Sequence, residues 1–299
     1  MFKKVSKEKI LQSVENLPVL SEVVSRCMTM LSDPNSSIRD LTELISKDQS
    51  ITAKIIRIAN SAFYGYSRQI KTLSEAIVIL GFRQIRTLLI TASSANHLSC
   101  KVEGYMIAQG DLWKHSYAVA FTSGLISRLT NIGQSDEIFT VGILHDIGKL
   151  VLGNHLKGSY REIISLTQDK NVNFAVAEEQ ILGIHHAEVG GLILAHWNFP
   201  EVMTESVRMH HHPLDAHEIS DQVGMLNLAD NWVRESGIGV GINGNMTDGL
   251  EGSILKNLKI KEGVKKQVLD YLNDEMKQME DLFPSSQSSV KLVEMSKKA

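Results

Sequence analysis

An imidazole and a carboxylate stand side by side at His145 and Asp146, inside the apolar run VGILHDIGKLVLG. Removing either group from water costs free energy unless it is hydrogen-bonded, paired or bound to a metal. Imidazole nitrogen and carboxylate oxygen together suit zinc, manganese, iron, cobalt or nickel better than calcium. If the run is a helix, the two side chains project about 100° apart and can both reach an ion above it. The pair is therefore a candidate for a metal site.

More groups of the same kind occur along the chain, at Asp111, His115, His186, His210, His211, His212 and Asp230. Asp111 and His115 are four residues apart and so share a helix face. Asp230 lies in the otherwise apolar LNLADNW, where a metal or a protonated histidine would offset the expense of a buried carboxylate. Lys149 lies one turn beyond His145, where its ammonium group could meet a phosphate oxygen.

Simpler interpretations stay open for several of these residues. Asp111 is also placed to cap a helix, and Lys149 suits a solvated surface. The three histidines before Pro213 suit a helix C-terminus, where imidazolium complements the dipole. Four further histidines are interpreted as structural or surface groups: His97, His155, His196 and His217. Buried histidines are commonly hydrogen-bonded core groups, so a purely structural scaffold is an alternative, and only the joint pattern favours a metal.

The composition favours a helical, cytoplasmic protein. The chain has 299 residues, of which 43% are hydrophobic, 6% are aromatic and only 5 are prolines, a balance that favours helix over sheet. The net charge of -3 offers no basic surface for nucleic acid. Cys27 and Cys100 have no Cys-x-x-Cys spacing and are expected to be reduced thiols. The start MFKKVSKEKI lacks a signal-peptide core, and no stretch resembles the roughly 18 to 20 apolar residues of a membrane helix.

Capping signals predict five or six short helices in the first 95 or so residues. Ser37 and Thr72 each begin a capping-box pattern, and Ser50 is expected to cap the run that starts at residue 51. Gly81 is expected to end the helix after Thr72 in a left-handed conformation. No convincing alternating strand pattern is present, so the fold is predicted to be all-α.

Longer helices are expected from about residue 108 onward. Residues 135–153 are apolar nearly all round and are expected to form one central helix. Further helices are predicted at residues 112–129, 187–197, 201–211, 221–236 and 264–283.

Residues 236–249 are predicted to be a glycine-rich loop, and residues 285–299 a polar tail. The stretch Gly239-Val-Gly241-Ile-Asn-Gly244 matches a dinucleotide fingerprint by letters, but no strand precedes it. The expected organisation is a helical N-terminal part at 1–105, a metal-site part at 106–258 and a C-terminal helix with its tail at 259–299.

The residues resemble a known family. His115 in LWKHSYAVA, His145-Asp146 in GILHDIGKLVL and Asp230 in LNLADNW are similar to the H…HD…D pattern of the HD superfamily of helical metal-dependent phosphohydrolases. The N-terminal half, with SDPNSSIRDLTELISKDQSITAKIIRIANSAFYG, resembles the opening of an HDOD domain. The resemblance covers roughly residues 10–235. It implies an HD-like helical bundle with an N-terminal helical subdomain.

The resemblance also implies a ligand set, taken from the HD-GYP relatives that cleave cyclic di-GMP at two- or three-metal sites. Carried over to this sequence, the set is His115, His145, Asp146, His186, His210, His211 and Asp230, with Asp111 at the position of a glutamate ligand. Histidines 211 and 212 are the alternative to 210 and 211. Lys149 matches the lysine of the HDxGK motif, and Lys149 and Asp146 are the expected catalytic residues. The implied cofactor is one or two ions of iron, manganese, zinc, nickel or cobalt.

The loop that carries the GYP signature is absent, because the chain continues after His212 as PLDAHEISDQ. HDOD proteins are regarded as signalling or regulatory modules. The resemblance therefore implies a cytoplasmic bacterial signal-transduction protein that acts on separate signalling proteins or a nucleotide-like ligand, without nucleic acid or membrane, in an oligomeric state left open. The alternative is a metal-dependent phosphohydrolase of nucleotides or phosphodiesters. There the ions would acidify the attacking water and, with Lys149, stabilise charge on the phosphoryl oxygens.

Overall fold

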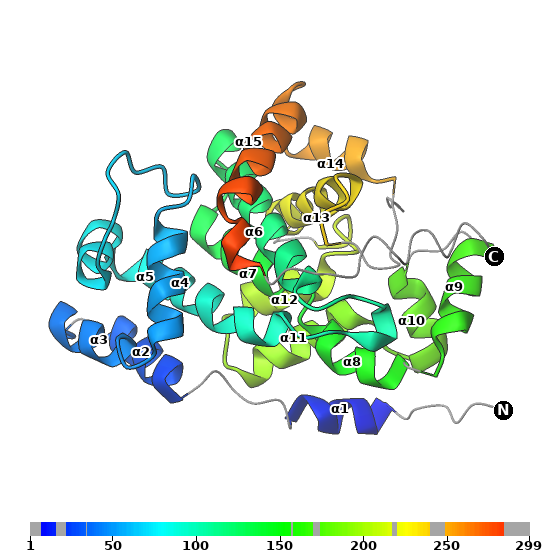
Figure 1. The fold of residues 1–299 in the computed structure, drawn as a ribbon. Coiled ribbons are helices and arrows are strands. Elements are labelled where there is room, and N and C mark those ends of the chain that lie inside the picture. The colour runs from blue at the N-terminus through cyan, green and yellow to red at the C-terminus, as the bar shows by residue number, and fades with distance from the viewer. Residues whose placement is uncertain are drawn as a thin grey trace.

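The computed structural model describes residues 7–15, 22–33, 35–156, 158–169, 174–216, 220–239 and 249–283. Throughout these residues the regular structure is helical, apart from one isolated antiparallel bridge between Val102 and Ile107 (Figure 1). The all-α prediction is confirmed. The polar tail and most of the glycine-rich loop lie outside the described residues.

The N-terminal helices are α1 (Lys7–Glu15), α2 (Glu22–Ser32), α3 (Ile38–Ile45), α4 (Gln49–Ala59) and α5 (Leu73–Leu98). Helices α2, α3 and α4 pack around the start of α5, whereas α1 lies apart from them against α8 and α11 (Figure 1).

Two of the three predicted caps are confirmed. Ser37 accepts a hydrogen bond from the amide of Asp40, and Thr72 accepts one from Glu75. The expected cap at Ser50 is wrong, because Asp48 accepts from the amide of Ile51 and starts α4 at Gln49. Aspartate caps as well as serine does, and Asp48 lies three residues before the amide it serves.

Gly81 divides α5 rather than ending it. Its φ of 76° is positive as expected, but its ψ of 167° is extended, and the helix resumes directly afterwards. By length and composition α5 is apolar enough to cross a membrane, which the sequence did not lead us to expect. However, 61% of its most apolar window is buried. Its contacts with α2, α3, α4 and α7 make it a core helix.

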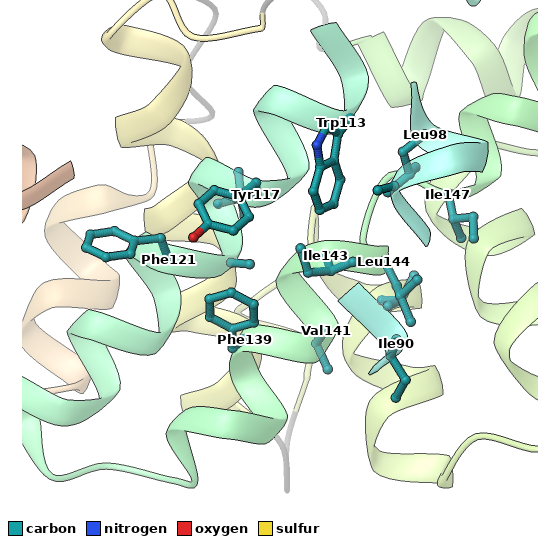
Figure 2. Packing of buried hydrophobic residues seen from close by; sticks show 14 of the residues in the cluster. Ile90, Leu98, Trp113, Tyr117, Phe121, Phe139, Val141, Ile143, Leu144 and Ile147 are labelled. Carbon is teal, nitrogen blue, oxygen red and sulfur yellow. The ribbon is translucent and has the colours of Figure 1, made fainter. Parts of the chain in front are cut away.

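The central layer consists of a short turn η1 (Glu103–Tyr105) and three helices, α6 (Asp111–Thr130), α7 (Ser135–Leu144) and α8 (Gly148–Leu156). Trp113, Tyr117 and Phe121 of α6 line up above Phe139 of α7, as Figure 2 shows. The two helices approach closely at Gly142, where a Cβ would lie 2.5 Å from the Cα of Ala120.

The single central helix expected at 135–153 is wrong. Residues 145–147 form a turn between α7 and α8. The amides of Ile147, Lys149 and Leu150 bond to carbonyls three residues back, which tightens the backbone here. Gly148 permits α11 to approach this turn closely, because a Cβ there would lie 2.0 Å from the carbonyl oxygen of His186 in α11. The His145-Asp146 pair therefore lies in a tight turn facing α11, not on a helix face.

The rest of the described chain forms α9 (Tyr160–Asp169), α10 (Phe174–Leu182), α11 (His186–His196), α12 (Glu201–Met209), α13 (Ser220–Glu235), α14 (Glu251–Asn257), α15 (Val264–Gln278) and η3 (Glu280–Leu282). The helices predicted at 187–197, 201–211 and 221–236 are confirmed within one turn at each end. The helix predicted at 264–283 begins as expected but ends five residues early, at Gln278, before the separate turn η3. Helix α11 packs against α8 and α12, and α13 packs against α6.

Helix α15 returns to the first half of the chain and packs along α6 (Figure 1). Its fully buried Glu275 accepts hydrogen bonds from the Tyr117 hydroxyl at 2.6 Å and from the amide of Ala62 at 3.0 Å. Just beyond the helix, Asp281 pairs with Arg57 at 2.7 Å. Contacts of α15 and Asp281 with Arg57, Ala62 and Tyr117 thus close the described chain around α6.

Candidate metal centre

His145 is held in one orientation by its own helix. Its Nδ1 lies 2.8 Å from the carbonyl oxygen of Gly142, and because a carbonyl only accepts, this nitrogen must carry the proton. The opposite nitrogen, Nε2, is buried without a hydrogen-bond partner and lies 3.4 Å from Oδ2 of Asp146. Burial lowers the pKa of His145, but Asp146 and Asp230 outweigh it and the net shift is upward.

His115 comes to the same place from α6. Its Nδ1 lies 3.2 Å from the carbonyl oxygen of Ile238, and its Nε2 lies 3.1 Å from Asp230 and 3.7 Å from Asp146. The Ile238 carbonyl can approach because Gly239 follows it with a φ of +64°. A Cβ there would lie 2.7 Å from that of His115. Gly239, the first glycine of the stretch that matches a dinucleotide fingerprint by letters, therefore allows the Ile238 carbonyl to reach His115.

Asp146 lies between two histidine groups. Its Oδ2 faces His145, and its Oδ1 lies 3.3 Å from Nε2 of His186. Burial raises the pKa of Asp146, but Lys149, His145 and His186 together hold it well below its usual value. The carboxylate is therefore ionised and faces both groups at once.

The second group contains His186, His210 and His211. Nδ1 of His210 donates to the carbonyl of Val207 at 2.7 Å, and its Nε2 is buried without a partner. Nε2 of His211 lies 2.9 Å from Nε2 of His186. Burial, with neighbouring histidines, holds the pKa values of His210 and His211 well below normal, so both rings are neutral. Neutral imidazoles are the form that binds metals.

Two groups of three side chains in the described part of the chain have the spacing of metal ligands. In His115, His145 and Asp146, and again in His186, His210 and His211, one ligand atom from each residue lies within 4.8 Å of the others. Tetrahedral ligands with bonds of about 2.1 Å to an ion lie about 3.4 Å apart, so small movements would complete either group. The partnerless Nε2 atoms of His145 and His210 fit such an ion.

Asp230 supports the first group from α13. It hydrogen-bonds His115 and pairs with Arg234 at 3.3 Å. Burial raises the pKa of Asp230, but Arg234 and His115 more than reverse this and hold it well below normal. The sequence did not point to Arg234, although its spacing of four residues from Asp230 on one helix was a usable signal.

Lys149 is buried beside Asp146, and its Nζ donates to Oδ2 at 2.6 Å. The same ammonium lies 5.8 Å from the ring centre of Tyr105. The interpretation of Lys149 as a solvated surface charge is therefore wrong.

Asp111 is half-buried at the first position of α6, after Gly110 as N-cap, so the alternative that Asp111 is the cap is also wrong. It belongs to neither ligand group among the described residues.

The remaining histidines lie away from the two groups or at their edge. His212 is exposed, and its ring centre lies 6.0 Å from that of His185, so the pair nearest His186 is 210 and 211. His155 contacts Ser13, and His196 is exposed. His217 lies outside the described residues.

Sequence reasoning missed Glu178 of α10. This fully buried carboxylate accepts hydrogen bonds from Nδ1 of His186 at 2.8 Å and from the hydroxyl of Tyr105 at 2.5 Å. A signal was present, because Phe174, Glu178 and Leu182 are four residues apart and share one helix face. A carboxylate on an apolar face calls for a buried partner.

Comparison with known proteins identifies the family. The family model of the HDOD domain matches residues 17–213. The chain belongs to the HDOD family. The resemblance drawn from the sequence is thus confirmed.

Several solved structures share the fold. The HDOD domain protein of Geobacter sulfurreducens is 23% identical with a TM-score of 0.68, and the match covers 93% of this chain and 99% of that one. A protein of Shewanella amazonensis SB2B described as a candidate phosphohydrolase is 25% identical with a TM-score of 0.70, covering 93% and 100%. A candidate metal-dependent phosphohydrolase from the same organism is 18% identical with a TM-score of 0.64, covering 93% and 97%.

Curated relatives of this HDOD chain are longer. A protein of Treponema pallidum (strain Nichols) is 22% identical over 227 residues, which are 75% of this chain and 44% of that protein. YuxH of Bacillus subtilis (strain 168) is 26% identical over 179 residues, 60% of this chain and 38% of YuxH. The chain therefore spans less than half the length of the curated relatives it matches.

Proposed function

We propose that this HDOD protein is a signal-transduction module whose two ligand groups bind one or two divalent transition-metal ions. The observation that carries the proposal is the state of His145 and His210. Each ring donates from Nδ1 to a carbonyl of its own helix, and each leaves a buried Nε2 without a partner. A buried polar nitrogen without a partner costs free energy, and a bound cation would remove that cost.

The chemistry of the donors supports a transition metal. The two groups offer five imidazoles and one carboxylate, a set that suits iron, manganese, zinc, nickel or cobalt and not calcium. His115, His145, Asp146, His186, His210 and His211 are the proposed ligands. Asp230 and Asp111 are proposed as further ligands, which would require both side chains to turn toward the ions.

The position of Asp146 supports two ions rather than one. Its two oxygens face different groups, as a carboxylate that bridges two cations must do. The charge on Asp146 and Asp230 would balance part of the charge of the ions.

A regulatory role is favoured over turnover by the burial of the centre. Of the proposed ligands from the two groups, His211 is the most exposed, and the other five are at most 4% exposed. The chain also lacks the GYP sequence on which the substrate of the related phosphodiesterases depends. We propose that the module acts in the cytoplasm on a separate signalling protein or a nucleotide-like ligand.

Metal analysis of the full chain, purified without chelator, tests the metal centre. We expect one or two ions per chain, a lower content in His145→Ala and His210→Ala, and no change in the exposed control His196→Ala. Less than about 0.2 ion per chain, also after incubation with each of the five metals, would overturn the proposal.

Hydrolysis of a phosphodiester is the second candidate function. It is favoured by the pairing of Lys149 with Asp146, which places a cation beside the candidate ions, where charge on a phosphoryl oxygen could be stabilised. A bound ion would supply Lewis acidity and a more acidic water. The test is turnover of bis(4-nitrophenyl) phosphate and cyclic dinucleotides by metal-loaded protein. Turnover abolished in Asp146→Asn would establish catalysis, and its absence in fully loaded protein would exclude it for these substrates.

A further inference from the structure

Glu178 is the acceptor of several converging hydrogen bonds. Oε2 accepts from the amide of His186 at 2.7 Å and from its Nδ1 at 2.8 Å, while Oε1 accepts from the hydroxyl of Tyr105 at 2.5 Å. All three residues are at most 1% exposed. The carboxylate of α10 thus joins the start of α11 to the turn η1, and it does so next to the second ligand group.

The direction of these bonds determines what His186 presents to the centre. An ionised carboxylate can only accept, so Nδ1 of His186 must donate and carry a proton. In the neutral ring this leaves the lone pair on Nε2, which faces Oδ1 of Asp146 at 3.3 Å. Two acceptors this close repel each other unless a cation contacts both of them.

His186 differs from the other histidines in how it is held. Nδ1 of His145, His210 and His115 is bonded to a backbone carbonyl, whereas Nδ1 of His186 is bonded to a carboxylate. A carboxylate makes an imidazole more basic and a stronger metal ligand than a carbonyl does. The carboxylate of Glu178 is in turn hydrogen-bonded by Tyr105 of the turn η1.

Tyr105 contacts both sides of the centre. Its hydroxyl holds Glu178, and its ring lies 5.8 Å from the Nζ of Lys149, the partner of Asp146. Burial and the neighbouring carboxylate raise the pKa of Tyr105 well above its usual value, so the hydroxyl remains a donor. The turn is pressed against α8, where a Cβ on Gly104 would lie 2.2 Å from the carbonyl oxygen of Gly153.

We infer that Glu178 and Tyr105 are positioning residues that fix His186 with Nδ1 protonated and Nε2 directed at the second ligand group. The inference rests on the proposed metal centre for its consequence, which is the affinity of one ion. The ion of the His186, His210 and His211 group depends on the Glu178–Tyr105 pair. The ion of the His115, His145 and Asp146 group does not.

The experiment compares wild type with Glu178→Gln and Tyr105→Phe, with Glu179→Gln as the matched control. Glu179 is the next residue of the same helix and is exposed. Glu178→Gln replaces one acceptor oxygen by an amide that donates, so one of the buried donors loses its acceptor. Tyr105→Phe removes one hydroxyl and keeps the ring. If Glu178→Gln does not fold, Tyr105→Phe still tests whether the pair positions His186.

The first measurement is the protonation of the His186 ring in chelator-treated protein, from ¹⁵N spectra of labelled histidine assigned with His186→Gln. We expect a proton on Nδ1 alone in wild type and Glu179→Gln, and a population with the proton on Nε2 in Glu178→Gln. A proton on Nε2 of His186 in wild type, or identical spectra in wild type and Glu178→Gln, would overturn the inference. This measurement needs no metal, so it decides the role of Glu178 even if the metal centre proves wrong.

The second measurement is titration with Co²⁺, followed by its visible absorption. We expect wild type and Glu179→Gln to bind two ions, and Glu178→Gln to bind one of them about 10- to 100-fold more weakly, with a smaller effect of Tyr105→Phe. If Glu178→Gln weakened the binding of both ions equally, or left the binding of both unchanged, the assignment to the second group would be wrong. If wild type binds no Co²⁺, the proposed function fails and the ring spectra alone judge the positioning role.

Discussion

Lys149 donates a hydrogen bond of 2.6 Å from its Nζ to Oδ2 of Asp146, and neither side chain is more than 7% exposed. An ammonium and a carboxylate buried together each depend on the other, because either alone would be an uncompensated charge. A divalent ion beside Asp146 would take over part of the role of Lys149. The stability of the protein and its metal content are therefore linked through this pair.

Replacing Lys149 by methionine is expected to destabilise the metal-free protein by about 3 to 5 kcal/mol, the usual cost of breaking a buried ion pair. With saturating Mn²⁺ the difference from wild type should shrink, because the ion compensates Asp146. Urea unfolding with chelator and with Mn²⁺ measures both effects. The control is Lys266→Met, at an exposed position of α15. A variant as stable as wild type in chelator would contradict this account.

The metal-free protein is expected to gain stability as the pH rises from 5.0 to 6.5. Burial and neighbouring histidines hold the pKa values of His210 and His211 well below the ordinary 6.5. In this window the unfolded chain has more protons on these two rings than the folded one, so each histidine increases stability with pH by up to about 1.4 kcal/mol per unit.

The two buried aspartates of the centre add no slope in that window. Asp146 and Asp230 have pKa values well below 3.8 and are ionised throughout. The pKa of His145 is raised, so the folded state keeps this proton to a higher pH than the unfolded chain does, and His145 opposes the slope as the pH approaches 6.5. His211→Gln should remove about half of the slope in urea midpoints. An equal slope in wild type and variant would refute the assignment.

Gly148→Ala is expected to destabilise the protein by at least about 1 to 3 kcal/mol, as overpacking of a close contact does. The added Cβ would lie 2.0 Å from the carbonyl oxygen of His186 and 2.7 Å from the amide of Gly190, and backbone atoms cannot move aside easily. Because α8 and α11 would separate, metal content should fall as well.

The matched control is Gly252→Ala in α14, where a Cβ meets nothing within 4 Å. It is expected to leave metal content unchanged and to stabilise by about 0.5 to 1 kcal/mol, since alanine favours helix. Urea unfolding and metal analysis measure both variants. Equal stability of the two would show that the contact at Gly148 is not tight.

Glu275→Ala is expected to destabilise by about 2 to 4 kcal/mol, because the Tyr117 hydroxyl and the Ala62 amide lose their acceptor. Metal affinity should be unchanged, since neither residue contacts the ligand groups. Asp274→Ala, at an exposed neighbour, is the control. Thermal unfolding and Co²⁺ titration of the two variants check this prediction, and a loss of Co²⁺ affinity in Glu275→Ala would speak against it.

The residue types made much of the centre predictable. Imidazoles and carboxylates in apolar helices need partners, and the residues selected by the family resemblance, apart from Asp111, are the ones that the fold brings together around Asp146. The turn after Leu144 could not be predicted, because the apolar pattern continues through it and the bend depends on contact between Gly148 and α11. The sequence could not distinguish Glu178 from its neighbour Glu179. Glu178 is buried only because it packs against His186 and Tyr105 in the folded protein. The predicted start of α4 was two residues too late, because Asp48 and Ser50 are both suitable caps. Sequence patterns rarely locate a helix end to within two residues.

The closure of the chain around α6 has a consequence for synthesis. Glu275 reaches an amide 213 residues earlier, and Asp281 pairs with a side chain 224 residues earlier. Contacts between such distant residues close large loops and slow folding. The ribosome releases the partners of Glu275 and Asp281 long before it adds α15, so the face of α6 that α15 covers stays open during most of translation. The nascent protein completes its core only when its last described helix has emerged.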